Sequence, residues 1–311
     1  MSRIHEALKK AERERAAQKP GEADLSGLDR IPLSTAMPEI PGDPAEAQSV
    51  APSSSEYLSY DDVRARCSGV RWQLDPHQNI FQDGDPATPE AEQFRTLRSR
   101  LYQLRGNQPL RTILVTSALL GEGKSFVANN LAHAIIRQPD RRALILDADL
   151  RRARLHTVLG APAAPGLTEY LSGDADEMSV LQCGMGSNLC FIPGGNPVRN
   201  PSELLSNGRL KILLERMAPL FDWVILDSPP CVPVADASVL AEMCDGVLLV
   251  VRSGSTPVGA AQKAVQELRG KHIVGVVLNA IGKTHLDHES YYQGYGYGET
   301  APNGHRSATP A

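Results

Sequence analysis

The feature that most constrains the fold is an eight-residue segment, Ala-Leu-Leu-Gly-Glu-Gly-Lys-Ser, which ends at Ser125. An apolar, β-branched run at 112–116 precedes it and predicts a buried strand, and the run that starts at Ser125 predicts a helix. Glycines allow a tight turn whose N–H groups point at one anion, and the helix N-terminus adds partial positive charge. The context therefore predicts a P-loop rather than an ordinary glycine turn before a helix. The residues expected around a bound nucleoside triphosphate are Ala118, Leu119, Leu120, Gly121, Glu122, Gly123, Lys124, Ser125 and Phe126.

The composition argues against several other classes of protein. The net charge of −4 gives no sign of a nucleic-acid partner. No run approaches the roughly 18 apolar residues that span a bilayer, and the first residues carry no apolar secretion segment. The five cysteines are unclustered, which predicts reduced thiols in a cytoplasmic protein and no metal site. They stand at positions 67, 183, 190, 231 and 244.

The chain divides by composition into four parts. Residues 2–18 favour a helix with its few apolar residues on one face, which either frays in solvent or docks onto a partner. Residues 19–55 are rich in Pro, Gly, Ser and acids and predict a disordered linker, whereas residues 56–87 are ambiguous. The expected parts are a candidate docking helix at 1–18, a mostly linker segment at 19–87, a P-loop domain at 88–281 and a flexible tyrosine-rich tail at 282–311.

Strands and helices alternate between Arg111 and Ile281. Short strands separated by helices predict an α/β fold with a mainly parallel sheet that helices cover on both faces. Ligands of such sheets bind at the carboxyl ends of the strands. The predicted strands are 112–116, 143–147, 189–192, 223–227, 246–251 and 273–278, and the predicted helices lie near 89–104, 125–137, 202–217, 235–242 and 257–269.

Two of the predicted strands end in aspartate beside the loop. Asp147 and Asp149 follow one apolar run, and Asp227 ends another. Carboxylates in such places can hold Mg²⁺ through water or orient a hydroxyl. Each aspartate alone could be a helix cap or a turn former. Three acids around one phosphate loop instead meet the geometric requirements for phosphoryl transfer.

Together these segments resemble the bacterial tyrosine autokinases, or BY-kinases, of capsular and exopolysaccharide biosynthesis. Those are P-loop proteins of the wider MinD/ParA class. The opening Met-Ser-Arg-Ile-His-Glu-Ala-Leu-Lys-Lys is similar to the exopolysaccharide-associated subgroup, and the resemblance covers roughly residues 88–298. It rests on the loop, the acid-bearing strands with Val-Ile-Leu-Asp-Ser-Pro-Pro, Glu92-x-x-Arg95-x-x-Arg98, Asn200-Pro-Ser-Glu-Leu-Leu and Asp245-Gly-Val-Leu-Leu-Val-Val-Arg.

The resemblance implies ATP and Mg²⁺ as cofactors and a role for each residue of the site. Lys124 would bind the β and γ phosphates, and Asp147 would act as base near the attacking tyrosine hydroxyl. Asn279 would contact the adenine. The implied catalytic residues are Lys124, Asp147, Asp149 and Asp227, and the implied metal residues are Ser125, Asp149 and Asp227.

The resemblance also implies assembly into a ring. Glu92, Arg95 and Arg98 would meet a neighbouring subunit, although their spacing also permits a simple pair within one helix. One departure separates the chain from the MinD/ParA switch ATPases, which carry a second lysine early in the loop, where this chain has Leu119. Leu120 stands where many of the kinases have proline.

Four of the eight tyrosines lie within seven residues near the end of the chain, among glycines. Rings in such a segment have no apolar neighbours against which to bury. A low-complexity tail is the alternative, but this kinase family phosphorylates such tails in trans. Four phosphates would add roughly −6 to −8 charge and should weaken a ring by repulsion. The expected acceptors are Tyr291, Tyr292, Tyr295 and Tyr297.

The leading hypothesis is an ATP-dependent protein-tyrosine autokinase that regulates exopolysaccharide polymerisation or export. It would form a homo-oligomer in the cytoplasm and be recruited to the inner face of the membrane by a separate membrane protein of the polysaccharide copolymerase type. The alternatives are a MinD/ParA-type switch ATPase, which Leu119 and the tail disfavour, and a nucleotide-binding scaffold without kinase activity.

Overall fold

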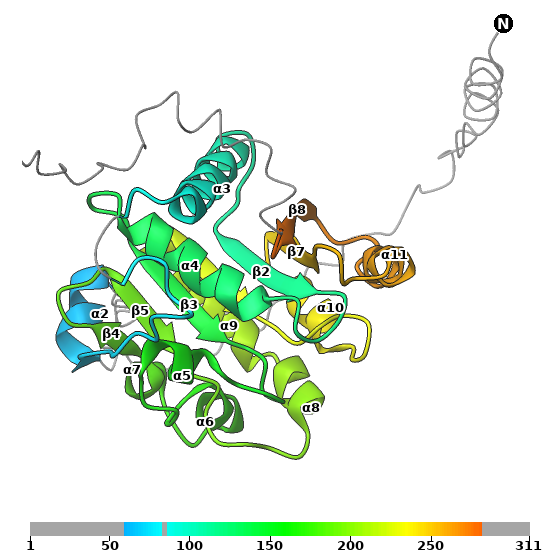
Figure 1. Cartoon of the computed structure of the whole chain (residues 1–311). Coiled ribbons are helices and arrows are strands. Elements are labelled where there is room, and N and C mark those ends of the chain that lie inside the picture. The colour runs from blue at the N-terminus through cyan, green and yellow to red at the C-terminus, as the bar shows by residue number, and fades with distance from the viewer. Residues whose placement is uncertain (1–58, 83–85, 282–311) are drawn as a thin grey trace, which may run out of the picture. The chain divides into compact units, whose positions relative to one another are not determined.

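An eight-stranded sheet runs through residues 59–82 and 86–281, the part of the chain that this computed structural model describes (Figure 1). These residues belong to a unit that begins at Glu56. The docking helix and the tyrosine tail predicted from the sequence fall outside the described residues. The strands are β1 (Ser68–Val70), β2 (Thr112–Ser117), β3 (Ala143–Asp147), β4 (Gln182–Gly184), β5 (Leu189–Ile192), β6 (Trp223–Asp227), β7 (Gly246–Arg252) and β8 (Ile273–Asn279).

The sheet is mainly parallel, as the alternation of strands and helices predicts. Its order is β1-β4-β5-β3-β6-β2-β7-β8. Only the pairing of β4 with β5 is antiparallel among the described strands. The six predicted strands are confirmed at β2, β3, β5, β6, β7 and β8.

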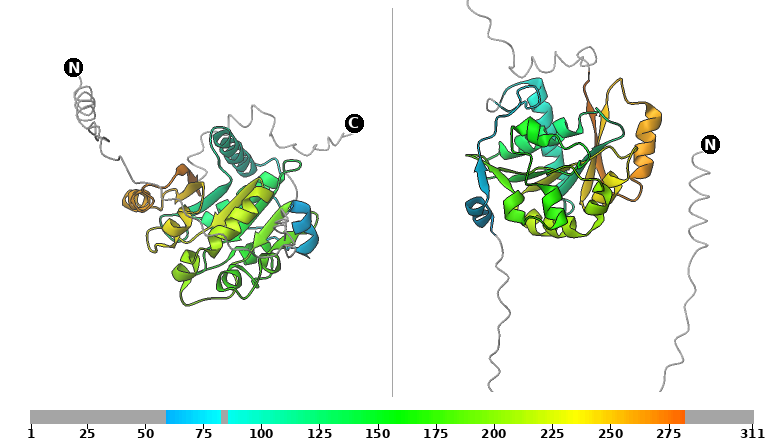
Figure 2. Two further views of the ribbon diagram at one scale, coloured as in Figure 1. Left: turned by 180° about the vertical axis from the view of Figure 1, so that it is seen from behind. Right: turned by 90° about the horizontal axis from the view of Figure 1, so that it is seen from below.

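Helices cover both faces of this sheet. The view of Figure 1 shows α3 and α4 on one face, and the view from behind in Figure 2 shows α9 on the other. Leu131 of α4 packs in one apolar cluster with Ile145, and Leu213 of α9 packs in a second cluster with Leu146. Neighbouring residues of β3 thus face opposite clusters, as in a strand buried on both sides. The helices are α2 (Tyr60–Arg66), α3 (Pro89–Arg105), α4 (Lys124–Ile136), α5 (Leu155–Leu159), α6 (Leu167–Ser172), α7 (Glu177–Val180), α8 (Pro201–Ser206), α9 (Arg209–Met217), η1 (Ala218–Leu220), α10 (Asp236–Ala241) and α11 (Val258–Glu267).

The single helix predicted at 202–217 is two helices. The chain breaks between α8 and α9 at Gly208, whose φ of 82° lies in the left-handed region. Glycine adopts that conformation without the steric cost that other residues meet. The apolar pattern continues across the break, and this continuity is why the sequence favoured one long helix.

The segment assigned from its sequence mostly to a linker, 19–87, is ordered where the structure describes it. Residues 59–82 fold onto the domain, so the fold begins well before the predicted boundary at 88. Ser59 starts α2 with a capping box, in which its hydroxyl accepts a hydrogen bond from the N–H of Asp62. Trp72 meets Phe191 edge to face, with ring centroids 6.3 Å apart. Phe81 is fully buried.

Buried polar side chains of α4 hold the last turn of this segment. Asn130 accepts a hydrogen bond from the Ile80 N–H at 2.8 Å and donates to the Gln78 carbonyl at 3.0 Å. Asn129 donates to the same carbonyl at 3.1 Å. A polar helix face can be buried here because the irregular segment leaves backbone groups that need partners.

Two of the five cysteines are joined, contrary to the prediction that all are reduced. Cys67 and Cys183 form a disulfide with their Cα atoms 6.3 Å apart. The parallel pairing of β1 with β4 sets Gly69 opposite Cys183 and so brings the two cysteines together. The pairing bridges 116 residues and could not be read from local spacing. The other three cysteines are free.

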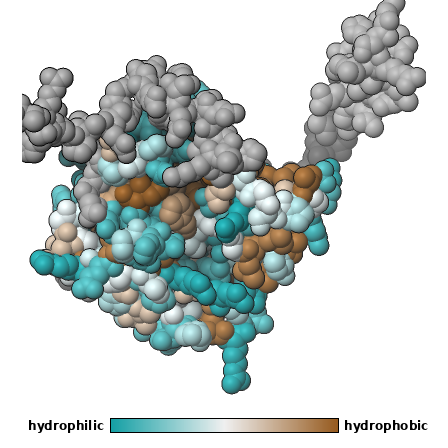
Figure 3. Space-filling model, viewed as in Figure 1, coloured by the Kyte–Doolittle hydropathy of each residue, from teal (hydrophilic) through white to brown (hydrophobic). Residues whose placement is uncertain are grey.

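Exposed apolar side chains gather at one edge of the sheet. Val258 and Val265 of α11 and Val276 and Leu278 of β8 are each about half exposed or more. Brown atoms lie on the corresponding right-hand side of Figure 3. Within the described part of the chain β8 pairs only with β7, which leaves its outer edge open. None of the described helices is both long and apolar enough to cross a membrane.

Replacing Asn130 by alanine should destabilise the fold by about 1–3 kcal/mol. It leaves the partly buried Ile80 N–H without its acceptor and removes one of two donors to the Gln78 carbonyl. Urea unfolding followed by circular dichroism measures this change. Asn107→Ala is the matched control, since Asn107 is exposed and makes only a 3.5 Å contact. Equal free energies of unfolding for the Asn130→Ala and Asn107→Ala variants would contradict a stabilising role for the Asn130 hydrogen bonds.

His133 should make stability depend on pH. Burial lowers its pKa to about 4, against about 6.5 in an unfolded chain. Between about pH 4 and pH 6.5 the folded state therefore binds fewer protons than the unfolded state. Neutral His133 stabilises the fold above about pH 6.5, and this stabilisation is lost as the pH falls towards 4. The loss amounts to about 3 kcal/mol. Urea titrations across this range should show a steeper loss for wild type than for His133→Gln, and parallel curves would contradict the assignment.

Candidate functional site

The loop before α4 has the conformation of an anion-binding turn. Gly121 and Gly123 have φ values of 78° and 93°, and α4 begins at Lys124 without a side-chain cap. The first N–H groups of the helix are therefore free to meet a ligand. The φ of 93° at Gly123 favours glycine, and a Cβ atom there would also lie 2.0 Å from the Asn279 amide nitrogen.

Side chains around the loop hold its shape. The buried Glu122 carboxylate accepts from the Leu119 N–H at 2.8 Å and from the Thr256 hydroxyl. Asn279 donates to the Glu122 carbonyl at 2.9 Å, and Arg252 donates to the Gly121 carbonyl at 2.9 Å. Glu122 and Asn279, both predicted to contact the nucleotide, are thus bound to the loop itself.

The hydrophobic residues of the loop lie in different environments. Ala118 is buried, and Leu119 packs partly against the core rather than extending forward. Leu120 is 53% exposed and lines the pocket in front of the loop, as does Phe126. The position where switch ATPases carry a lysine is therefore occupied by a packing residue.

Two aspartates stand side by side where β3 and β6 end. The parallel register pairs Asp147 directly with Asp227. One oxygen of Asp147 accepts from the N–H groups of Arg154 and Leu155, at 2.8 and 2.9 Å. The other oxygen, Oδ1, is buried without a hydrogen-bond partner among the described residues, and so is Oδ1 of Asp227. Two buried acceptors in this state can receive a proton or bind a cation or its water.

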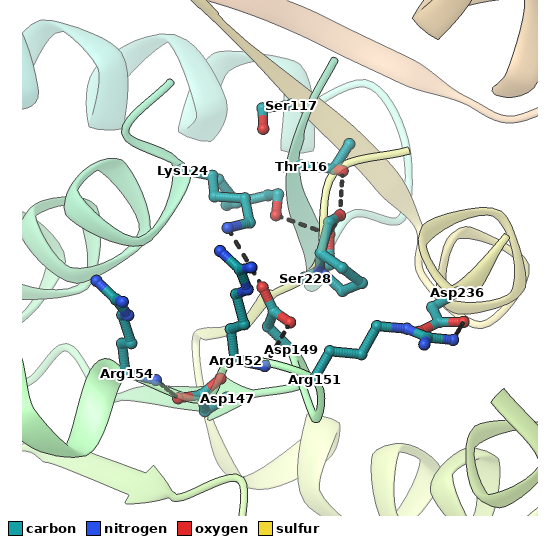
Figure 4. Close-up of polar contacts among 12 residues, drawn as sticks. Thr116, Ser117, Lys124, Asp147, Asp149, Arg151, Arg152, Arg154, Ser228 and Asp236 are labelled. Carbon is teal, nitrogen blue, oxygen red and sulfur yellow. Dashed lines mark hydrogen bonds and ion pairs between the residues drawn. The ribbon is translucent and has the colours of Figure 1, made fainter. Parts of the chain in front are cut away.

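The third aspartate contacts the loop lysine. Lys124 Nζ lies 3.4 Å from Asp149 Oδ2, and the two side chains are only 12% and 5% exposed. The other oxygen of Asp149 accepts from the Arg152 N–H at 3.1 Å (Figure 4). Asp147 and Asp149 therefore point to different partners, as their alternation along the chain predicts.

Burial and mutual repulsion set the protonation of the aspartate pair. Burial, followed by the charge of Asp227, raises the pKa of Asp147 well above that of a free carboxyl group. Burial also raises the pKa of Asp227 to about 6, although Lys124 and a hydrogen bond from Ser125 lower it. Two adjacent carboxylates disfavour double ionisation, so the pair favours a shared proton until a cation arrives.

The donor set around Ser125 fits Mg²⁺ bound largely by phosphate and water. The Ser125 hydroxyl already contacts Asp227, whose second oxygen lacks a partner in the described structure. No group of three or more His, Cys, Asp or Glu side chains in the described ranges is spaced to hold a metal alone. Mg²⁺ at nucleotide sites commonly takes one or two protein ligands and keeps several waters. The residues present therefore suit a nucleotide-bound ion rather than a metal cage.

A pocket of about 700 Å³ opens in front of the loop. Part of its wall consists of residues that the sequence analysis did not assign. The run Leu-Arg-Arg-Ala-Arg directly after Asp149 is a sequence signal for some of them. The wall from 75 to 78 had no such signal, because residues 56–87 were ambiguous in sequence. The unassigned lining residues are Asp75, Gln78, Arg152, Arg154, Thr157 and Val158.

Arg151 has a structural role outside this pocket. It pairs with the buried Asp236 at 2.7 Å (Figure 4). It also donates to the Ser202 hydroxyl at 2.9 Å. Ser202 in turn donates to Asp236 at 2.6 Å. This cluster joins the chain after β3 to α8 and α10. It therefore fixes the backbone from which Arg152 and Arg154 extend.

The remaining predicted residues lie apart from the pocket or outside the described structure. Arg95 pairs with Glu92 at 2.8 Å within α3, and Arg98 donates to the Ala134 carbonyl of α4 at 2.6 Å. These contacts lie within one chain and leave the intersubunit role a prediction. The four tail tyrosines fall outside the described residues.

Comparison with known proteins supplies the family. No protein-family model matches the chain. It is 33% identical over 216 residues to tyrosine-protein kinase YwqD of Bacillus subtilis, a match that covers 69% of this chain and 90% of YwqD. It is 35% identical over 213 residues to the putative tyrosine-protein kinase EpsB of Ralstonia nicotianae, covering 68% of this chain but only 28% of EpsB.

Solved structures agree with these relatives. The kinase domain of the Escherichia coli tyrosine kinase ETK superposes with a TM-score of 0.59 at 35% identity, covering 62% of this chain and 76% of that domain. The chimerical protein CapA2B2 superposes with a TM-score of 0.63 at 27% identity, covering 72% of this chain and all of that one. The P-loop, the aspartates at the ends of β3 and β6 and these matches agree, and the chain belongs to the bacterial tyrosine-protein kinases.

Proposed function

We propose that the chain uses ATP and Mg²⁺ to phosphorylate tyrosines in the C-terminal tail of another copy of itself. The observation that carries this proposal is the pair of buried, unpartnered oxygens on Asp147 and Asp227, placed beside the loop lysine. One of these oxygens can bind a cation or its water, and the other can accept the proton of an incoming hydroxyl.

The loop would bind the triphosphate. N–H groups at the start of α4 would contact the phosphate oxygens, and Lys124 would exchange part of its contact with Asp149 for the β and γ oxygens. Ser125 and Asp227, with Asp149 nearby, would hold Mg²⁺ and its waters. The ion would neutralise charge that develops on the transferring phosphoryl group.

Asp147 would receive the proton. As the tyrosine oxygen forms its bond to the γ phosphorus, the bond from phosphorus to the bridging oxygen breaks and ADP leaves. The phenolic proton passes to Asp147 Oδ1, the oxygen without a partner. The N–H groups of Arg154 and Leu155 fix the other oxygen and so aim the base.

The acceptors would be Tyr291, Tyr292, Tyr295 and Tyr297. We place the kinase in a homo-oligomeric ring in the cytoplasm, held at the inner face of the membrane by a separate copolymerase-type activator. The chain spans only 28% of EpsB and 30% of AmsA, two of the kinases it resembles. Regulation of exopolysaccharide export is the role that this arrangement supports.

Lys124→Ala should lower phosphotyrosine formation by about 100-fold or more, because it removes the charge against the transferred phosphoryl group. Immunoblotting and mass spectrometry after incubation with Mg-ATP and an activator measure this. Lys211→Ala is the matched control, because Lys211 is an exposed lysine of α9. A chain that ends at Ser290 should also lose labelling while it still binds ATP. Wild type that forms no phosphotyrosine under these conditions would reject the kinase.

Asp147→Asn should slow phosphoryl transfer by about 10²- to 10⁴-fold while nucleotide affinity changes little, since the amide cannot accept the tyrosine proton. Single-turnover labelling gives the rate, and a fluorescent ATP analogue gives the affinity. Asp174→Asn, at an exposed position, is the control. Loss of binding in parallel with rate would instead assign Asp147 to the nucleotide site. Phosphate release without tyrosine labelling in wild type would favour a switch ATPase.

A further inference from the structure

Two arginines of the pocket have guanidinium groups without a partner among the described residues. The side chains of Arg152 and Arg154 make no hydrogen bond or ion pair with any residue that the structure describes, whereas their neighbour Arg151 is bound to Asp236 and Ser202. Both free arginines line the pocket in front of the loop. Free cations at the wall of a substrate pocket favour an anionic ligand.

The two side chains face different parts of the pocket. In Figure 4 both side chains extend to the same side of the chain, with Arg152 next to Lys124 and Arg154 farther from it. Each is held at its backbone by one of the site aspartates: Arg152 N–H donates to Asp149, and Arg154 N–H donates to Asp147. Arg152 therefore lies nearer the loop lysine, and Arg154 lies farther from it along the pocket wall.

The acidic side chains of the pocket leave this charge largely uncompensated. Asp149 already pairs with Lys124. Asp75 is the other acid of the pocket wall, and its carboxylate accepts from the His77 N–H at 2.9 Å. Among the described residues, two free guanidinium groups thus face one remaining carboxylate, and the described pocket wall keeps a positive excess.

The tail carries matching charge at a matching spacing. Asp287 and Glu289 stand four and two residues before Tyr291. In an extended peptide alternate side chains share one face, so both carboxylates would lie on the side of the Tyr291 ring. Two residues of extended chain span roughly 7 Å, a distance that suits neighbouring parts of one pocket. No acid stands at these positions before Tyr297, where Gln293 and Tyr295 occur.

We propose that Arg154 selects the acceptor by binding carboxylates two and four residues before the tyrosine, which makes Tyr291 the preferred acceptor of the tail. This inference rests on the proposed kinase function and adds its peptide preference. The contact is solvent-exposed and bidentate at best, so it should change the rate on Tyr291 by roughly three- to tenfold.

The test uses full-length chains as separate enzyme and acceptor. The enzyme carries Phe at 291, 292, 295 and 297, so it cannot label itself there, and the acceptor carries Lys124→Ala. With Mg-ATP and an activator, mass spectrometry gives initial rates at Tyr291 and Tyr297 over a range of acceptor concentrations. The Asp287→Asn and Glu289→Gln substitutions in the acceptor should together lower the rate of phosphorylation at Tyr291 by roughly three- to tenfold. The change should appear in the KM for the acceptor, and the rate at Tyr297 should stay the same.

Charge exchange distinguishes recognition from damage. Arg154→Glu in the enzyme should slow Tyr291 of the natural acceptor to a similar extent, and an acceptor with Asp287→Lys and Glu289→Lys should restore the rate. Arg269→Glu, an exposed arginine after α11, is the matched control and should change neither rate. Affinity for a fluorescent ATP analogue and the rate at Tyr297 report whether the variant enzyme is folded.

The outcomes separate the two proposals. Equal slowing of Tyr291 and Tyr297, or no recovery on charge exchange, overturns the role of Arg154 while kinase activity stands. The role of Arg154 is also overturned if Tyr297 is labelled at the normal rate and none of the charge substitutions changes the rate at Tyr291. Absence of phosphotyrosine on every acceptor with the unmodified Arg154 enzyme rejects the kinase function itself, and the peptide preference with it.

Discussion

The site depends on the parallel pairing of β3 with β6, which places Asp147 against Asp227 in the interior. Two buried carboxylates in register repel each other, and the surrounding structure offsets only part of that cost, since the pKa of each stays raised. Lys124 and the Ser125 hydroxyl act on Asp227, and the N–H groups of Arg154 and Leu155 act on Asp147. The loop and the start of α5 therefore stabilise the negative charges of the aspartates that the sheet places side by side. These segments act together as one electrostatic unit. An oxygen on each aspartate remains for chemistry.

Local patterns were enough to predict the centre of the fold. The strands β2, β3 and β6 are continuous apolar runs, and the Gly-Lys-Ser turn fixes where α4 begins. The segment at 59–82 could not be read in this way, since its order comes from partners far along the chain. The amides of Asn129 and Asn130 resemble ordinary polar residues of a helix until the Gln78 carbonyl and the Ile80 N–H are seen against them. The Cys67–Cys183 pairing depends on strand neighbours in the same way.

The site shows a similar division. Lys124, Ser125 and the three aspartates were predicted because their spacing matches the demands of a triphosphate, and the structure brings them together. Glu122 and Asn279 were assigned to the nucleotide, but their described contacts hold the loop. Sequence position places a residue near a ligand without saying which way its side chain turns. The same limit applied to the three arginines after Asp149, of which one is tied into the scaffold and two are free.

The contact of Asn279 with the Glu122 carbonyl has a consequence for how copies of the kinase compete for a substrate. It anchors the end of the last strand to the lip of the nucleotide site, so the tail departs from beside its own catalytic loop. Tyr291 lies ten residues beyond Ile281, a contour of at most about 35 Å. A tether of that length gives an effective concentration in the millimolar range near its own root. In the proposed reaction, transfer between copies would require an assembly that presents a neighbour's tail at a comparable local concentration, and ring geometry would become a kinetic parameter.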